Sequence, residues 1–105
     1  MHPLHGKWRI IAHGPLGDLP SDNEIVVDGD TFTGTMYDEK SGKDYPLVNG
    51  KLDGNHLTFE VTMKLGFVGM QFTLEGDVAE DGKTVQGTFK ALKMEGTFEG
   101  EKVSE

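Results

Sequence analysis

The fold is decided by residues 56–78, which read HLTFEVTMKLGFVGMQFTLEGDV. Across residues 56–65 every second residue is apolar, from Leu57 to Leu65, and the residues between them are polar. The same alternation returns from Met70 to Val78. A period of two residues is that of a β-strand with one dry face and one wet face. Because only residues 66–69 separate the two runs, we expect them to form an antiparallel hairpin.

Weaker versions of this pattern extend in both directions from the central pair. They predict six further strands, at residues 7–13, 24–28, 31–38, 44–52, 85–89 and 94–101, which gives eight in all. Residues 90–95 hold good helix formers, but six residues are too few for a stable helix, so this stretch is predicted to be a hairpin turn with a bulge. Residues 13–23 contain two prolines and two glycines and are predicted to be one long loop, a rim or lid over the fold.

A glycine recurs on the predicted dry face. The pattern is apolar, any residue, glycine, polar, apolar, and it occurs at residues 32–36, 48–52, 74–78, 85–89 and 94–98. Glycine inside a strand relieves crowding and allows a sharp bend, so its repetition favours a coiled sheet that closes on itself. The predicted fold is therefore a single all-β domain over residues 1–105, an eight-stranded up-and-down antiparallel β-barrel. A two-sheet β-sandwich is the alternative.

Composition excludes several classes of function. The chain of 105 residues has 18 acidic and 10 basic residues, a net charge of −8, and no cysteine. Disulfides and Cys-ligated metal sites are excluded, and the negative charge makes nucleic acid and anionic lipid improbable partners. No apolar run approaches the length of about 20 residues that a membrane-spanning helix needs. The first seven residues lack the apolar run of a secretory signal, so a cytoplasmic location is expected.

One tripeptide links the chain to known barrels. Gly6-Lys7-Trp8 opens the first predicted strand and is similar to the Gly-x-Trp of lipocalins and avidin-like proteins, and the whole chain resembles small bacterial lipocalin-like domains. The resemblance implies a calycin-type barrel, Trp8 packed across its closed end, and a lumen that holds a small hydrophobic molecule. The chain departs from typical lipocalins because it has no disulfide and no helix after the barrel. It has one tryptophan, so the biotin site of avidin-like proteins is not carried over.

The expected function is binding of a small hydrophobic molecule in the barrel lumen, with no cofactor. Phenylalanine and methionine side chains on the predicted inner face offer an adaptable apolar lining. The residues predicted to bind the ligand are Trp8, Phe32, Met36, Phe59, Met63, Met70, Phe72, Phe89 and Phe98. The same side chains are equally expected if the lumen is simply a filled core.

Two other functions stay open. The first is a cofactor-free enzyme of the cyclase or isomerase type, in which His13, Tyr45 or Asp38 at the rim of the barrel moves a proton. The second is a structural domain that forms a homo-oligomer.

No metal site is predicted. His2 and His5 have the spacing of a helix in a region that is not helical, and His56 lies on the wet face of its strand. Five acidic residues of the outer faces are expected to serve solubility rather than calcium binding: Glu75, Asp77, Glu95, Glu99 and Glu101.

Overall fold

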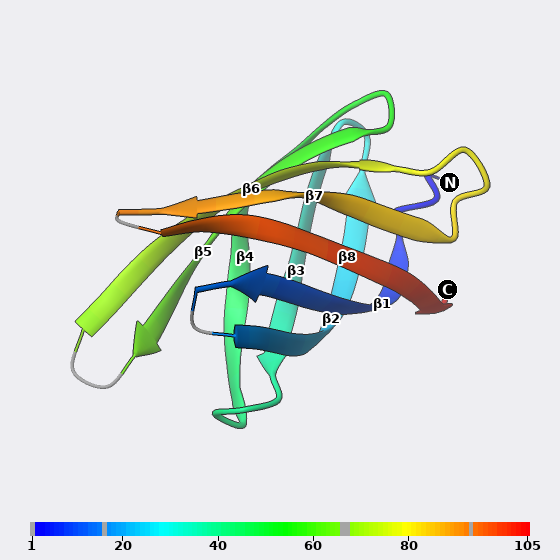
Figure 1. Cartoon of the computed structure of the whole chain (residues 1–105). Coiled ribbons are helices and arrows are strands. Elements are labelled where there is room, and N and C mark those ends of the chain that lie inside the picture. Colours follow the sequence, from blue (N-terminus) through cyan, green and yellow to red (C-terminus); the bar gives the residue numbers. More distant parts are fainter. Residues whose placement is uncertain (1, 16, 66–67, 93) are drawn as a thin grey trace.

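The protein is a closed antiparallel β-barrel of eight strands (Figure 1). The computed structural model describes residues 2–15, 17–65, 68–92 and 94–105. The strands are β1 (Gly6–Gly14), β2 (Gly17–Asp28), β3 (Thr31–Asp38), β4 (Lys43–Asp53), β5 (His56–Leu65), β6 (Val68–Val78), β7 (Thr84–Ala91) and β8 (Met94–Ser104). The described residues include no helix. They therefore contain no helix long and apolar enough to cross a membrane.

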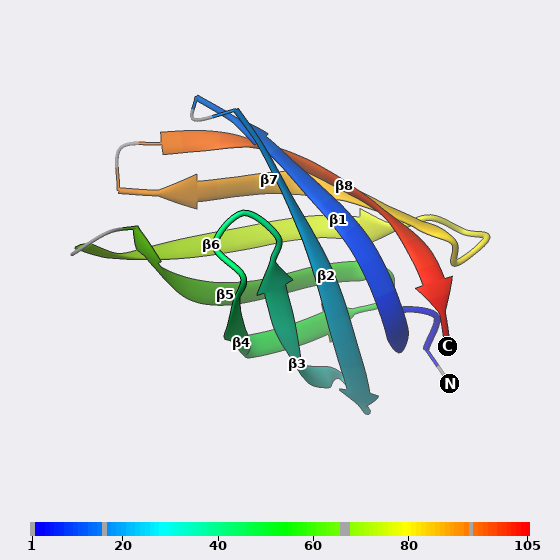
Figure 2. The same cartoon turned by 90° about the horizontal axis from the view of Figure 1, so that it is seen from below.

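Each strand pairs with the next one along the chain, and β1 pairs with β8 to close the sheet. The closing register runs from Lys7 opposite Ser104 to His13 opposite Thr97. The up-and-down barrel is thus confirmed, and the two-sheet alternative is wrong. The connections alternate between the two ends of the barrel (Figures 1 and 2). We call the end with both chain termini the closed end, and the end with the β1–β2, β3–β4, β5–β6 and β7–β8 connections the open end.

Inward-facing glycines allow the sheet to bend, as the repeated sequence pattern predicts. The tightest approach is between β6 and β7, where Gly76 lies opposite Gly87. A Cβ atom at Gly87 would lie 2.0 Å from the carbonyl oxygen of Glu75 and 2.5 Å from the Cα atom of Gly76. No other residue fits there without moving the backbone. The glycine pair therefore sets how closely these strands coil around the core.

The long loop predicted at residues 13–23 is wrong. Residues 17–23 belong to β2, which pairs with β1 from Gly14 opposite Gly17 onward. Pro20 lies just outside the β2–β3 pairing, which begins at Ser21 opposite Asp38. Its carbonyl oxygen is on the β3 side of the strand, where it accepts the Glu39 N–H. The backbone nitrogen of a strand residue is on the same side as its carbonyl oxygen, so the missing N–H of Pro20 removes no hydrogen bond between β1 and β2. The alternation was hidden because two inward residues of β2, Ser21 and Asn23, are polar.

One smaller expectation also needs correction. The β7–β8 hairpin is present, but its register runs without a shift from Ala91 opposite Met94, so the predicted bulge is wrong. A bulge occurs instead in β4, between Val48 and Lys51, where Asn49 has a φ of 55°. Tyr45 and Leu47 face inward before the bulge, and the extra residue shifts the alternation so that Gly50 and Leu52 face inward after it. The β5–β6 strands pair as predicted, while residues 66–67 of their connection lie outside the described residues.

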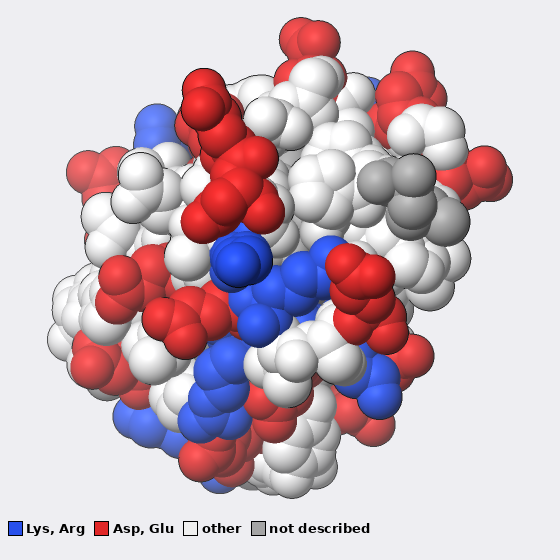
Figure 3. Space-filling view, turned by 90° about the vertical axis from the view of Figure 1, so that its right-hand side faces the viewer, with Lys and Arg blue, Asp and Glu red and all other residues white. Residues whose placement is uncertain are grey.

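The N-terminal segment seals the closed end. Leu4 is only 1% exposed, and its carbonyl oxygen accepts a 2.8 Å hydrogen bond from the indole Nε1 of Trp8. The Nζ of Lys102 donates to the carbonyl oxygen of Pro3 at 2.8 Å and lies 5.9 Å from the centre of the Trp8 ring. On this face basic side chains lie in the middle of a ring of acidic ones (Figure 3). Trp8 therefore packs across the closed end, as the Gly-x-Trp resemblance implies.

We predict that Leu4→Ala lowers the free energy of unfolding by about 2–5 kcal/mol, since it leaves a cavity under the seal. The matched control is Leu92→Ala, because Leu92 is 90% exposed and should change stability by less than about 0.5 kcal/mol. Urea unfolding followed by the fluorescence of Trp8 measures both. Equal, small effects of the two substitutions would show that the N-terminal segment is not part of the core.

Candidate functional site

A narrow cavity lies inside the barrel and reaches toward the open end. Its walls come from six strands, and all but three of the lining side chains are apolar. The lining residues are Ile10, Ala12, Leu19, Ser21, Asn23, Met36, Asp38, Phe59, Val61, Met63, Phe72, Leu74 and Phe89. We call this space the lumen cavity. Its position in the core and its apolar wall are those of a small-molecule site in a barrel.

The lumen cavity is small because aromatic rings fill most of the barrel. Phe32 and Phe59 meet edge to face at 5.8 Å between ring centres, and Phe72 and Phe89 do so at 5.9 Å. The space left is about 50 Å³. Typical drug-sized ligands occupy pockets of roughly 300–1,000 Å³. In this arrangement the lumen accommodates only a few non-hydrogen atoms.

Three buried polar residues form one wall of the cavity, which we call the polar wall: Ser21 and Asn23 on β2 and Asp38 on β3. They are 5%, 3% and 6% exposed. The Nδ2 of Asn23 donates to Ser21 Oγ at 2.9 Å, and that hydroxyl donates to the carbonyl oxygen of Ile10 at 3.3 Å. Asp38 lies directly opposite Ser21 across the β2–β3 pair. Its carboxylate makes no hydrogen bond or ion pair with any described residue.

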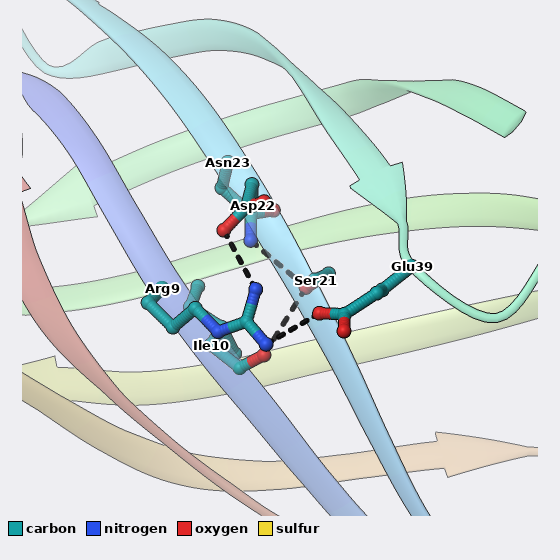
Figure 4. Close-up of polar contacts among 6 residues, drawn as sticks. All are labelled: Arg9, Ile10, Ser21, Asp22, Asn23 and Glu39. Atoms are coloured by element: carbon teal, nitrogen blue, oxygen red, sulfur yellow. Dashed lines mark hydrogen bonds and ion pairs between the residues drawn. The ribbon is translucent and has the colours of Figure 1, made fainter. Parts of the chain in front are cut away.

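An ion-pair cluster on the outside of the same strands, the outer clamp, fixes the end of β3. Arg9 on β1 binds Asp22 on β2 at 3.0 Å and also binds Glu39, the residue that follows β3 (Figure 4). The Glu39 N–H donates to the carbonyl oxygen of Pro20 at 3.2 Å. Hydrogen bonds to Asp22 and then Glu39 raise the pKa of Arg9 above its ordinary value. The outer clamp therefore holds the backbone beside Asp38 against β2.

The predicted ligand-binding residues divide into three groups. Met36, Phe59, Met63, Phe72 and Phe89 line the lumen cavity. Trp8, Phe32 and Phe98 are buried in the core without lining it, and Met70 is partly buried against the core. Ser21 and Asn23 were not predicted as site residues. Both residues are spaced by two from Ile25, so they could have been assigned to the same inner face. That assignment would have required placing polar side chains on an inner face.

The three candidates for proton transfer are not brought together. His13 lies near the open end but on the outer face, where its Nδ1 is 2.7 Å from Asp18 and its Nε2 is 3.1 Å from Glu99. Tyr45 is buried and its hydroxyl has no hydrogen-bond partner among the described residues, yet it does not line the lumen cavity. Only Asp38 faces the cavity.

The other histidines have structural partners. His2 accepts the Leu4 N–H at Nδ1 and lies 2.8 Å from the carbonyl oxygen of Gly54 through Nε2, and His5 accepts the Val27 N–H at Nδ1. His56 on the outer face is 3.0 Å from Asp77 and 3.4 Å from Glu75. Within the described ranges no three His, Asp or Glu residues are placed to hold a metal ion.

Comparison of the chain with models of known protein families and with characterised proteins finds no match. A function must therefore be inferred from the geometry and chemistry of the lumen cavity.

The outer histidines predict a pH dependence of stability. Hydrogen bonds to Asp18 and Glu99 raise the pKa of His13, and a hydrogen bond to Asp77 raises that of His56. A raised pKa in the folded state adds stability below the unfolded value of about 6.5, and this contribution disappears as pH rises through the folded value. We expect His13→Asn combined with His56→Asn to destabilise the barrel more at pH 6 than at pH 9 in urea unfolding. An equal loss at both pH values would show that neither ring is charged in its carboxylate pair.

Proposed function

We propose that the barrel binds a small, mainly apolar molecule in the lumen cavity and admits it through the open end. The observation that carries this proposal is the polar wall. A barrel interior that serves only stability is best filled with apolar side chains, since buried polar groups cost free energy unless fully hydrogen-bonded. Ser21, Asn23 and Asp38 depart from that rule together, at one place, facing the same space. Local departures of this kind cluster at functional sites.

The small volume restricts the proposal to compact ligands or to ligands that displace side chains. Met36 and Met63 both line the cavity, and unbranched thioether side chains adapt readily to a new neighbour. Met36 is only partly buried, so it can move without leaving a hole in the packed core. A linear molecule that enters between these two side chains fits this geometry better than a broad ring system does.

The resemblance of the first strand supports the same proposal. An eight-stranded up-and-down barrel with Trp8 at its closed end is compatible with a lipocalin-like domain, and we propose that assignment together with a cytoplasmic location. Binding is proposed rather than proton-transfer catalysis because His13, Tyr45 and Asp38 do not share one site.

A blocking substitution tests lumen binding. Ala12 lines the cavity near the open end of β1, so Ala12→Phe should fill the space of about 50 Å³ and prevent uptake. Val26→Phe, at a 49% exposed position on the outer face of β2, adds an aromatic ring without touching the lumen. The probe is n-hexanol, and the measurement is the NMR shift of the Met36 and Met63 methyl groups during its titration.

The expected result is a saturable shift in the unmodified protein and in Val26→Phe, and no shift in Ala12→Phe. Urea unfolding shows whether the Ala12→Phe barrel is still folded. If the folded Ala12→Phe protein responds to hexanol as the parent does, the alcohol binds elsewhere and lumen binding is contradicted.

A further inference from the structure

We infer that the ligand of the lumen cavity carries a protonated amine, held by the carboxylate of Asp38, on a short apolar body. This inference rests on the proposed function and names the chemical class of molecule that the cavity selects.

Asp38 presents a carboxylate without a counter-charge to the cavity. Asp38 is 6% exposed, and no described residue forms an ion pair with it. Lys43 lies opposite Asp38 across the β3–β4 pair, but Lys43 is exposed and makes no such contact. Arg9 is committed to the outer clamp on the other side of the sheet. Among the described residues the Tyr45 hydroxyl is the one fully covered side-chain polar atom without a partner, so the Asp38 oxygens keep accessible surface at which a cation can bind.

The polar wall offers more acceptors than donors. Asn23 donates one of its two Nδ2 protons to Ser21, and Ser21 donates its hydroxyl proton to the carbonyl oxygen of Ile10. The Asn23 Oδ1 and the two carboxylate oxygens of Asp38 make no hydrogen bond with a described residue, and the second Nδ2 proton of Asn23 is the donor that this wall keeps. An ammonium group has three donors and no acceptor, which complements the three free oxygens. A carboxylate ligand would meet the like charge of Asp38.

The position of Asp38 places the amine near the entrance. Asp38 is the last residue of β3 and therefore lies toward the open end, whereas Phe59 and Val61 line the cavity farther along the barrel. A charged head near the mouth keeps part of its hydration, while the apolar body is buried against these side chains. The net charge of −8 also attracts a cation to the molecule and disfavours an anion.

Three probes with one alkyl chain separate charge from apolar contact. We would titrate n-hexylamine, n-hexanol and n-hexanoate at pH 7, with the n-butyl series in parallel, into the parent protein, Asp38→Asn and Glu24→Gln. Asp38→Asn keeps the shape of the side chain and removes its charge. Glu24→Gln is the matched control, because Glu24 is an exposed carboxylate on the neighbouring strand that belongs neither to the outer clamp nor to the cavity wall. Methyl shifts of Met36 and Met63 report binding in each case.

We expect the parent and Glu24→Gln to bind the amine at least about tenfold more tightly than the alcohol, and the carboxylate most weakly, because a hydrogen bond to a charged group is the stronger kind. Asp38→Asn should lose the preference for the amine and keep the affinity for the alcohol.

Distinct results overturn the inference and the proposed function. If the alcohol binds the parent as tightly as the amine, and Asp38→Asn changes neither, the amine inference is wrong while lumen binding stands. If Lys43→Ala destabilises the free protein and Lys43→Ala combined with Asp38→Asn adds no further loss, Asp38 has an internal partner and the inference is also wrong. If none of the probes shifts the Met36 and Met63 methyl groups, lumen binding itself is contradicted.

Discussion

Closure of the sheet between β1 and β8 is the constraint on which the rest of this small structure depends. Pairing along the register from Lys7 to His13 closes the sheet, so the described residues present no unpaired edge strand that would invite aggregation. Closure also decides what is inside. Once the sheet is a tube, every second residue of each strand faces one shared interior, and that interior must be filled by these side chains or by something else.

The interior is filled differently at the two ends of the barrel. At the closed end the N-terminal segment supplies Leu4, and the Trp8 indole ties that segment down through a backbone carbonyl oxygen. Partly buried residues dominate toward the open end, where Ala12, Met36, Met70, Ala91 and Met94 pack against the core without being covered. This difference means that rearrangement near the open end costs less buried contact than rearrangement near Trp8. The open end is therefore the end at which the packing is less complete.

Most of the fold could be predicted from the sequence because most strands obey one rule. Residues such as Leu57, Phe59 and Val61 alternate with polar neighbours, and this alternation predicts the number of strands. The inward glycines mark where the sheet bends, and they predict that it closes. The first half of β2 could not be predicted as a strand, because Ser21 and Asn23 are inward and polar while Pro20 suggests a loop. This segment is a strand because it pairs with β1, and the sequence of the segment alone does not show that pairing. The β4 bulge at Asn49 likewise depends on how neighbouring strands fit and leaves little trace in the sequence.

The candidate site and the failed prediction of β2 have the same physical cause. Hydrophobic periodicity detects strands that contribute apolar side chains to a core, and it fails where the inner face of a strand carries polar side chains. Ser21, Asn23 and Asp38 occupy inner positions on adjacent strands, and the outer clamp of Arg9, Asp22 and Glu39 stabilises the same strands from the opposite face. Because these ion pairs lie at the surface, they contribute little free energy, and their effect is on position. Arg9 ties the residue that follows Asp38 to β1 and β2, so the outer face of the sheet fixes where the polar side chains of the inner face lie.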